Sequence, residues 1–261
     1  YRFVIKIMHV FVMKRILLFM CISALILSCK KKESLQFNTA FFEVRSSDNC
    51  ASDNCAYAHF EVPIAQGNSV IANKINNDLQ FFLKSKLTNV LNKETTSYDT
   101  LALNFVKAYE EDRKSASEAT VAWEANFKLQ HKALSAVTYQ IVWNYFLFTG
   151  EAQATTGVKV FFYNTTSGTQ IPLNDLFLNF EGFKKYAEAE FNKQFVSKQK
   201  IESVIFTDAV FKLPENVYEQ NNEWILHYNY EEFSFNALDE IIIKLPKEKV
   251  TPFLNPLHFK N

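Results

Sequence analysis

The sequence contains few glycines, five among 261 residues. Loops that hold phosphate groups use several closely spaced glycines, because the backbone must approach the ligand. The Gly-x-Ser-x-Gly, Gly-x-x-x-x-Gly-Lys and His-Glu-x-x-His motifs are absent as well, and these mark common nucleophilic, nucleotide-binding and zinc-dependent sites. We therefore predict no catalytic residues and a protein that is not an enzyme.

An excess of charge of either sign is also missing, since 28 basic and 28 acidic side chains balance. No basic patch predicts binding to nucleic acid, and no acidic tail predicts a cationic partner. The five histidines show no metal-ligand spacing, so we predict no metal ion and no cofactor. Three acidic pairs are expected to be solvated rather than catalytic, and they are Glu110–Glu111, Glu188–Glu190 and Glu231–Glu232.

No hydrophobic run reaches the length of about 20 residues that a helix needs to span a bilayer. The longest candidate, Ile16–Leu27, is shorter and directly follows two basic residues. A basic stretch, a short apolar stretch and a small residue together describe a secretory signal peptide. We predict a signal peptide over residues 1–28, of which 13–28 form the signal proper and 1–12 an over-long start.

The end of this stretch, Ile26-Leu27-Ser28-Cys29, reads as a lipobox. The thiol of such a cysteine accepts a diacylglycerol, and a further acyl chain on the freed amine makes the anchor stable. The alternative is a buried helix that ends in an incidental cysteine. We favour lipidation of Cys29, with residues 29–36 as a polar tether. The expected location is extracytoplasmic, at the outer membrane facing the periplasm.

Two cysteines remain after the signal segment, Cys50 and Cys55. A close pair in an oxidising compartment favours a small disulfide loop. Zinc is the alternative, but a structural zinc site takes four ligands and no second cysteine pair exists. We therefore predict a disulfide between Cys50 and Cys55.

Hydrophobic periodicity predicts the fold class. Apolar residues recur every four positions from 69 to 91, which is typical of an amphipathic helix, with Asn68 or Ser69 as its cap. Alternation with a period of two at 120–130, 137–147 and 157–163 indicates three antiparallel strands. Further helices are expected at 101–115 and 182–200, and further strands at 37–45, 57–63, 210–213, 224–228 and 241–245. The pattern predicts an α+β fold, with an antiparallel β-sheet packed against a few amphipathic helices.

Four segments, in order, resemble one known family, and they are Phe60–Ile64 with Ile75-Asn76, Tyr145–Ala154, Thr166–Phe177 and Tyr230–Ile243. They resemble the extracytoplasmic region of RsiV-like and PdaC-like proteins, which is domain of unknown function family 3298 with an N-terminal PdaC-type domain of family 4163. The match Leu-x-Asp-Leu-Phe at 173–177 is the most specific. The resemblance implies one α+β region at 37–255, with halves at about 37–165 and 166–255.

The chain departs from this family in two of these motifs, and in the first it has Gly150-Glu151-Ala152-Gln153 where the family often has Gly-Gly-Ala-His. Gln153 stands where the family often has a histidine, and Leu238 stands where glycine is common. A glutamine can hydrogen-bond but cannot shuttle protons near neutral pH. The Asp-His-His metal set of the deacetylases is missing too. The catalytic activity of the PdaC-like deacetylases therefore does not follow from the shared region.

The favoured hypothesis is a non-enzymatic envelope lipoprotein whose domain binds a protein or a cell-wall glycan. The family includes a lysozyme-binding receptor, so the resemblance implies a lysozyme-like envelope protein or a peptidoglycan fragment as partner, besides the membrane that holds the lipid. Trp123 and Trp143 are expected mostly in the core. The candidate binding residues lie on one strand end and the loop after it, and they are Phe146, Phe148, Thr149, Gly150, Glu151 and Gln153.

Two alternatives stay open. A hydrolase or deacetylase acting on cell-wall glycan predicts convergent carboxylates or histidines in a pocket. A structural or chaperone-like envelope protein predicts an exposed apolar patch instead.

Overall fold

The structure is a computed structural model, and it describes residues 35–46, 55–88, 97–115, 121–196, 210–232 and 240–259. All of these residues belong to one compact unit, Leu35–Asn261. The signal peptide expected at residues 1–28 lies outside the described residues, as do Cys29, Cys50 and Leu238. Lipidation at Cys29 and the disulfide between Cys50 and Cys55 therefore stay predictions.

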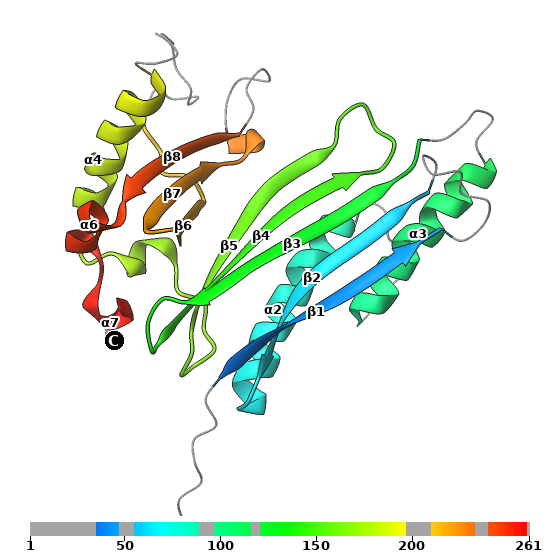
Figure 1. The fold of residues 1–261 in the computed structure, drawn as a ribbon, viewed down its shortest axis with the longest axis horizontal. Helices are drawn as coiled ribbons and strands as arrows, with labels where there is room; N and C mark the ends of the chain where they lie inside the picture. Colours follow the sequence, from blue (N-terminus) through cyan, green and yellow to red (C-terminus); the bar gives the residue numbers. More distant parts are fainter. Residues whose placement is uncertain are drawn as a thin grey trace, which may run out of the picture. The chain divides into compact units, whose positions relative to one another are not determined.

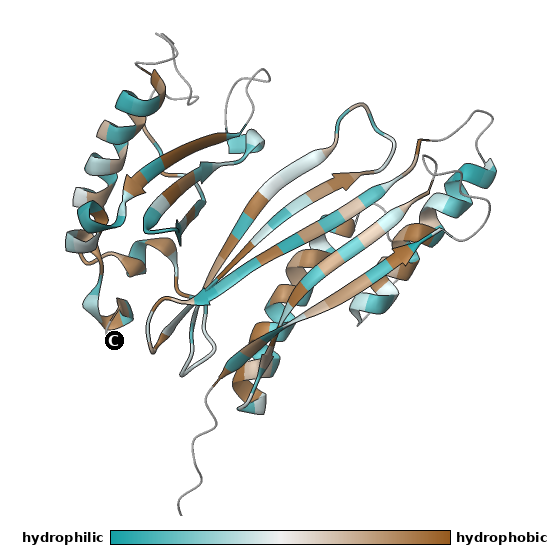
Figure 2. Cartoon of the chain, in the orientation of Figure 1, coloured by the Kyte–Doolittle hydropathy of each residue, from teal (hydrophilic) through white to brown (hydrophobic). Residues whose placement is uncertain are grey.

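Five strands form the larger sheet, in the order β1 (Gln36–Arg45), β2 (Tyr57–Gln66), β3 (Glu124–Ala133), β4 (Thr138–Phe148) and β5 (Thr155–Asn164) (Figure 1). Neighbouring strands are antiparallel except β2 and β3, which run parallel. A parallel pair needs a long crossover connection, and the two helices between β2 and β3 supply it. Hydrophobic and hydrophilic residues alternate along the strands (Figure 2), so one face of the sheet is mainly apolar.

Helices α2 (Ser69–Leu87) and α3 (Tyr98–Ser115) cover this apolar face, where α2 contacts β2 and α3 contacts β1 and β2 (Figure 1). Asn68 caps α2, because its side-chain oxygen accepts hydrogen bonds from the backbone N–H groups of Val70 and Ile71. The core between helices and sheet is fully buried and includes Phe60, Ile75, Leu79, Phe105, Phe127 and Trp143. Removing this apolar surface from water is the main force that holds the layers together.

A second sheet has three antiparallel strands, β6 (Asn216–Gln220), β7 (Glu223–Tyr228) and β8 (Ile241–Pro246). The β6–β7 hairpin turns at Asn221 and Asn222, whose φ angles of 52° and 62° are those of a tight two-residue hairpin turn. Two helices contact this sheet, and they are α4 (Phe180–Phe191), which continues as a π-helical turn (Asn192–Val196), and α6 (Lys247–Val250). The remaining short elements are η1 (Leu173–Leu176), η3 (Tyr230–Glu232), η4 (Thr251–Phe253) and α7 (Pro256–Phe259).

The second sheet covers the outer face of β4 and β5. Val142 and Val158 form a small buried cluster there with Tyr218 and Ile225. Gln140 of β4 donates through its amide to the backbone oxygen of Glu219 (2.9 Å), and the backbone N–H of Glu219 donates back (2.7 Å). On the part of this face where β1, β2 and β3 lie side by side, the side chains are instead half-buried or exposed, and they are Phe41, Glu43, Arg45, Tyr57, His59, Glu124 and Asn126.

The predicted α+β class and the antiparallel succession β3–β4–β5 are confirmed. The strand predicted at 210–213 is wrong, because residues 210–214 have no regular structure and the strand β6 begins at Asn216. The helix expected from Gly182 begins at Phe180 and becomes π-helical at Asn192. The parallel pairing of β2 with β3 was not predicted, because alternation reports which face is buried but not which strand is the neighbour.

Candidate functional site

Two rows of side chains cross the outer face of the larger sheet from β1 to β4. The strand register places Arg45, Tyr57, Glu124 and Phe148 in one row, and Glu43, His59, Asn126 and Phe146 in the next. Residues opposite each other on neighbouring strands lie on the same face, close enough to touch. These residues, together with Phe41, are called the open face below. Phe41 is 65% exposed and Phe146 is 36% exposed.

The charges of the open face are paired with one another. Arg45 donates from Nε to Glu43 Oε1 (3.3 Å), and this hydrogen bond lowers the pKa of the Glu43 carboxyl. The Arg45 guanidinium also lies 4.3 Å from the centre of the Tyr57 ring, a cation–π contact. Burial raises the pKa of Tyr57, and the nearby charge of Glu43 adds to this effect. The face therefore combines aromatic rings with hydrogen-bonding groups that are already ordered.

His59 and Asn126 lie in the middle of the open face. The two ring nitrogens of His59 lie 3.5 Å and 3.4 Å from carboxylate oxygens of Glu43 and Glu61. Asn126 donates weakly to Glu124 Oε1 (3.4 Å), while its own buried Oδ1 accepts no hydrogen bond from the part of the chain that the structure describes. An unsatisfied buried acceptor costs free energy, so a donor group supplied by a bound partner would stabilise this position.

The loop after β4 continues from the open face, and its residues Gly150, Glu151 and Gln153 are exposed. Gly150 has a φ angle of +82°, and a Cβ atom there would lie 3.1 Å from Trp123 Nε1. The left-handed backbone and the close approach both favour glycine. The Trp123 ring in turn packs 5.9 Å from the ring of Phe105 in α3. The loop is therefore held against the core at its first turn.

The structure thus places the sequence-predicted residues on one surface. Phe146 and Phe148 project on the outer face, and Thr149 to Gln153 follow directly. Trp143 is fully buried on the opposite face and Trp123 is half-buried, so these two tryptophans belong to the core as expected. Sequence reasoning missed the contributions of β1 and β2, which are Phe41, Glu43, Arg45, Tyr57 and His59. Only the cross-strand register brings them beside Phe146, and no local motif marks them.

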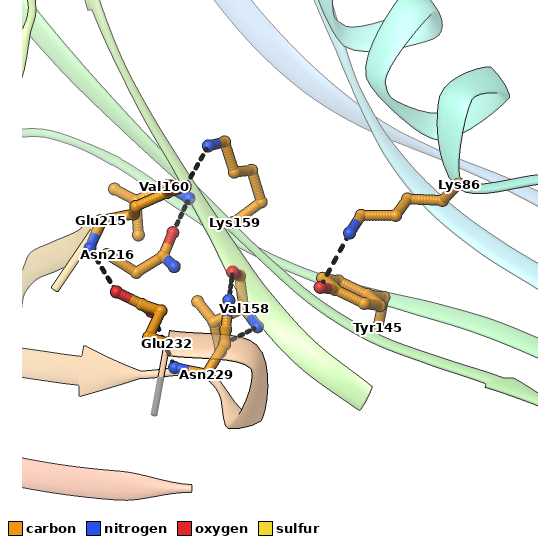
Figure 3. A network of polar contacts seen from close by, with 9 residues as sticks. All are labelled: Lys86, Tyr145, Val158, Lys159, Val160, Glu215, Asn216, Asn229 and Glu232. Carbon is orange, nitrogen blue, oxygen red and sulfur yellow. Dashed lines mark hydrogen bonds and ion pairs between the residues drawn. The ribbon is translucent and has the colours of Figure 1, made fainter. Parts of the chain in front are cut away.

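A polar network joins β5, the last strand of the larger sheet, to residues of the second sheet and the turn after it (Figure 3). The side-chain amide of Asn229 donates to the backbone oxygen of Val158 (2.9 Å), and its Oδ1 accepts from the backbone N–H of Val158 (2.8 Å). Asn216 Oδ1 accepts from the backbone N–H of Val160 (3.0 Å). The asparagine side chains therefore occupy the place that a sixth strand would take.

Glu232 holds this network in position. Its two carboxylate oxygens accept hydrogen bonds from the backbone N–H groups of Asn229 (2.8 Å) and Glu215 (2.9 Å) (Figure 3). Burial raises the pKa of the Glu232 carboxyl even though these bonds favour the ionised form. The expectation that the pair Glu231–Glu232 is solvated is therefore wrong for Glu232 and correct for the exposed Glu231.

Tyr145 lies on the inner face of the sheet, beside this network. Lys86 of α2 donates from Nζ to its hydroxyl (3.0 Å) and lies 4.5 Å from the ring centre. Gly157 faces Tyr145 from β5, and a Cβ atom there would lie only 2.5 Å from the hydroxyl and 3.0 Å from Asn229 Oδ1. Burial raises the pKa of Tyr145 further above its ordinary value, so the phenol stays protonated at neutral pH. These contacts anchor α2 to the sheet.

A second histidine, His131, links three strands. Its Nε2 lies 3.0 Å from Thr39 Oγ1 of β1, and its Nδ1 lies 2.6 Å from the hydroxyl of Tyr139 in β4. Phe37 stacks on the Tyr139 ring with centroids 3.9 Å apart. Burial lowers the pKa of His131. Both partners of the imidazole are hydroxyl groups on other strands, so His131 ties β3 to β1 and β4.

Within the described ranges, no group of three or more His, Cys, Asp or Glu side chains is arranged to hold a metal ion. None of the helices in these ranges is both long enough and apolar enough to cross a membrane.

The fold is the one seen in solved structures of DUF3298 family proteins. A DUF3298 family protein from Pseudomonas aeruginosa PAO1 matches with a TM-score of 0.55 and 16% identity, over 88% of this chain and 99% of that chain. A member of the same family from Bacteroides fragilis matches with a TM-score of 0.56 and 15% identity, over 88% and 99%. No family model and no curated protein matches the sequence. The predicted resemblance is thereby confirmed for family 3298 at the level of fold, and the PdaC-type domain stays a prediction.

The segments that carried the resemblance have structural tasks here. Asn76 makes two hydrogen bonds to the backbone of Ala65, one through each end of its amide (2.8 Å and 3.0 Å). Leu176 is fully buried, and Phe177 stacks on Phe183 with centroids 3.9 Å apart. Gln153, in the loop where the family often has histidine, is exposed. The most specific matches are therefore residues that pack in the core or satisfy the backbone groups at a strand edge, and their contacts here are structural.

Proposed function

We propose that this chain is an envelope lipoprotein whose domain binds a protein or a cell-wall glycan through the open face and the adjoining loop at Thr149–Gln153. The lipid anchor of this proposal rests on the lipobox at Cys29 alone. The binding role rests on one structural observation. The second sheet covers the outer face of β4 and β5, while over β1 to β3 the same face leaves Phe41 and the neighbouring aromatic residues accessible.

The chemistry of the open face supports binding rather than catalysis. Aromatic side chains that combine large contact area with few rotatable bonds dominate the energetics of protein interfaces. Their rings also stack on the apolar faces of sugars, while Asn126 and the carboxylates beside it supply hydrogen bonds. The histidine in the middle, His59, lies between the carboxylates of Glu43 and Glu61.

Binding can be measured with two purified probes, lysozyme and soluble muropeptides, using titration calorimetry on the purified chain. We expect one of them to bind, and Phe146→Ala to weaken that binding about tenfold, the loss typical of an interface aromatic. Phe81→Ala is the matched control, because Phe81 is 74% exposed but lies on α2, away from the open face. Absence of binding to both probes, or equal losses in the two variants, would contradict the proposal.

The anchor has its own test. Labelling of growing cells with a radioactive palmitate should mark the wild-type protein and leave Cys29→Ala unlabelled. An unlabelled wild-type protein would contradict the lipoprotein assignment, whereas the proposed binding role would not depend on this result.

A further inference from the structure

The free edge of β1 has backbone groups that no described residue satisfies. The register of β1 with β2 ends at Arg45 opposite Tyr57, and the backbone N–H of the next residue, Ser46, donates to the backbone oxygen of Ala56 (3.1 Å). Hydrogen-bonded pairs alternate along an antiparallel ladder, so the even-numbered residues of β1 bond β2. The odd-numbered residues therefore point their N–H and C=O groups away from the sheet, and they are Phe37, Thr39, Phe41, Glu43 and Arg45.

The bonding of β2 on its other side confirms this assignment. The backbone N–H of Tyr57 donates to the backbone oxygen of Trp123 (2.9 Å), on the side of β3. In β2 the odd-numbered residues therefore face β3 and the even-numbered residues face β1, as the ladder requires.

Sheet edges are commonly protected by proline, lysine, bulges or a covering element. The sequence of β1, Gln-Phe-Asn-Thr-Ala-Phe-Phe-Glu-Val-Arg, has no proline and no lysine, and its register with β2 is continuous over all of its residues. Its two charges, Glu43 and Arg45, come at its end and bind each other. Helix α3 packs on the inner face, where Tyr98 contacts Phe42 with centroids 5.3 Å apart, and so it does not pair with the edge.

A self-complementary pattern indicates what this edge fits. The outward-pointing residues are symmetric about Phe41, the most exposed aromatic of the open face. If two copies of β1 pair antiparallel about a two-fold axis at Phe41, the two Phe41 rings face each other across the axis. Thr39 then faces Glu43 of the second copy, and Phe37 faces Arg45. A register centred on Glu43 would instead place two carboxylates opposite each other, which is destabilising.

We infer that the chain forms a two-fold dimer by antiparallel pairing of β1 with β1 of a second copy, in the register that places Phe41 opposite Phe41. All outward-pointing groups of Phe37 to Arg45 gain partners, and no like charges face each other. The interface is isologous, because the same strand contributes from both sides. The two larger sheets become one continuous sheet, and the open faces of both copies lie on the same side of it. This inference goes beyond the proposed function and does not depend on it.

Sedimentation equilibrium of the purified chain over a range of concentrations tests the inference. We expect a monomer–dimer equilibrium, and Phe41→Lys should raise the dissociation constant roughly tenfold or more, because it replaces an aromatic pair by facing like charges. Phe41→Pro should also abolish the dimer while leaving the circular dichroism spectrum unchanged, since the N–H that it removes points outward. Ala40→Pro removes an N–H that bonds β2, so it should unfold the sheet instead.

Cross-linking fixes the register. Under mild oxidation Phe41→Cys should give a disulfide-linked dimer that the wild type does not give, since the two residues face each other across the axis. Glu43→Cys, which faces Thr39 of the second copy, should cross-link far less. A wild-type chain that sediments as a monomer, or a dimer that survives both Phe41→Lys and Phe41→Pro, would overturn the inference. A dimer that cross-links better at Glu43 than at Phe41 would overturn the register.

Discussion

The two edges of the larger sheet differ in how their backbone N–H and C=O groups are hydrogen-bonded. Along β5 every second residue from Val158 to Asn164 has a partner outside the strand, supplied by Asn229, Asn216 and the segment Thr169–Ile171. Along β1 the corresponding groups have no partner among the described residues. Within the part of the chain that the structure describes, the same sheet is therefore closed along β5 and open along β1.

The β5 edge shows which side chains satisfy backbone groups where a strand has no neighbour. An asparagine side chain takes the place of a missing strand at two positions inside the protein, at Val158 through Asn229 and at Ala65 through Asn76. A side-chain amide can do so because it carries a donor and an acceptor in one plane, like a peptide group. Along the β1 edge no side chain of the described residues takes this place, so the two edges differ in whether the chain itself satisfies their backbone groups.

The largest expected effect comes from removing the closure of β5. Asn229→Ala leaves the buried N–H and C=O of Val158 without partners, and we expect it to lower the free energy of unfolding by about 2–4 kcal/mol. Urea denaturation measures this. Asn38→Ala is the control, because the amide of Asn38 bonds Gln66 at the exposed surface (3.0 Å) and its loss should cost less than about 0.5 kcal/mol. Equal losses in the two variants would erase the distinction between the edges.

The second effect concerns the close approach at Gly157. In Gly157→Ala the new methyl group would lie 2.5 Å from the Tyr145 hydroxyl and 3.0 Å from Asn229 Oδ1. Such overpacking should lower the free energy of unfolding by about 1–3 kcal/mol, and thermal denaturation checks it. Pairing the change with Tyr145→Phe, which removes the hydroxyl, should recover part of the loss. Failure of that rescue would show that the strain lies elsewhere.

A third, smaller effect is pH-dependent and belongs to Glu232. Because burial raises the pKa of its carboxyl in the folded protein, the native state binds its proton more tightly than the unfolded chain does. Its contribution to stability is therefore present below the unfolded pKa and is lost as the pH rises through the native value. Relative to Glu232→Gln, the wild type should lose stability as the pH rises from the acidic range toward neutral. A wild type that gains stability relative to Glu232→Gln as the pH rises would contradict this account.

The smallest effect is expected on the open side. Phe41→Thr keeps a residue that favours strands and removes a ring that is 65% exposed, so the free energy of unfolding of dilute protein should change by about 0.5 kcal/mol or less. Chemical denaturation at low protein concentration measures this. A loss as large as that of Asn229→Ala would mean that Phe41 supports the fold of the monomer rather than an interaction.

Much of the fold could be predicted from the sequence, because a helix or strand that buries one face has apolar residues at regular intervals. The four-residue recurrence predicts α2, the cap at Asn68 is confirmed, and the alternation from Thr120 to Tyr163 predicts the succession of β3, β4 and β5. These signals are local, since each reports one face of one element.

The rest depends on long-range contacts that leave no local pattern. Asn229 bonds Val158, 71 positions away in the sequence, and Asn216 bonds Val160, 56 positions away. The residues next to these asparagines in the sequence form no motif that predicts either contact. For the same reason the sequence predicts only part of the candidate site. Phe146, Phe148 and the following loop stand together in the sequence, whereas Tyr57 and His59 join them only through the parallel pairing of β2 with β3.

Amide hydrogen exchange of dilute protein, resolved by residue, tests the contrast between the two edges most directly. The outward-pointing amides of Thr39, Phe41 and Glu43 should exchange near the rate of an unprotected chain, while those of Val158 and Val160 should be protected almost to the level of global unfolding. Equal protection of the two sets in dilute protein would contradict the account, because the β1 edge would then be closed by the chain itself.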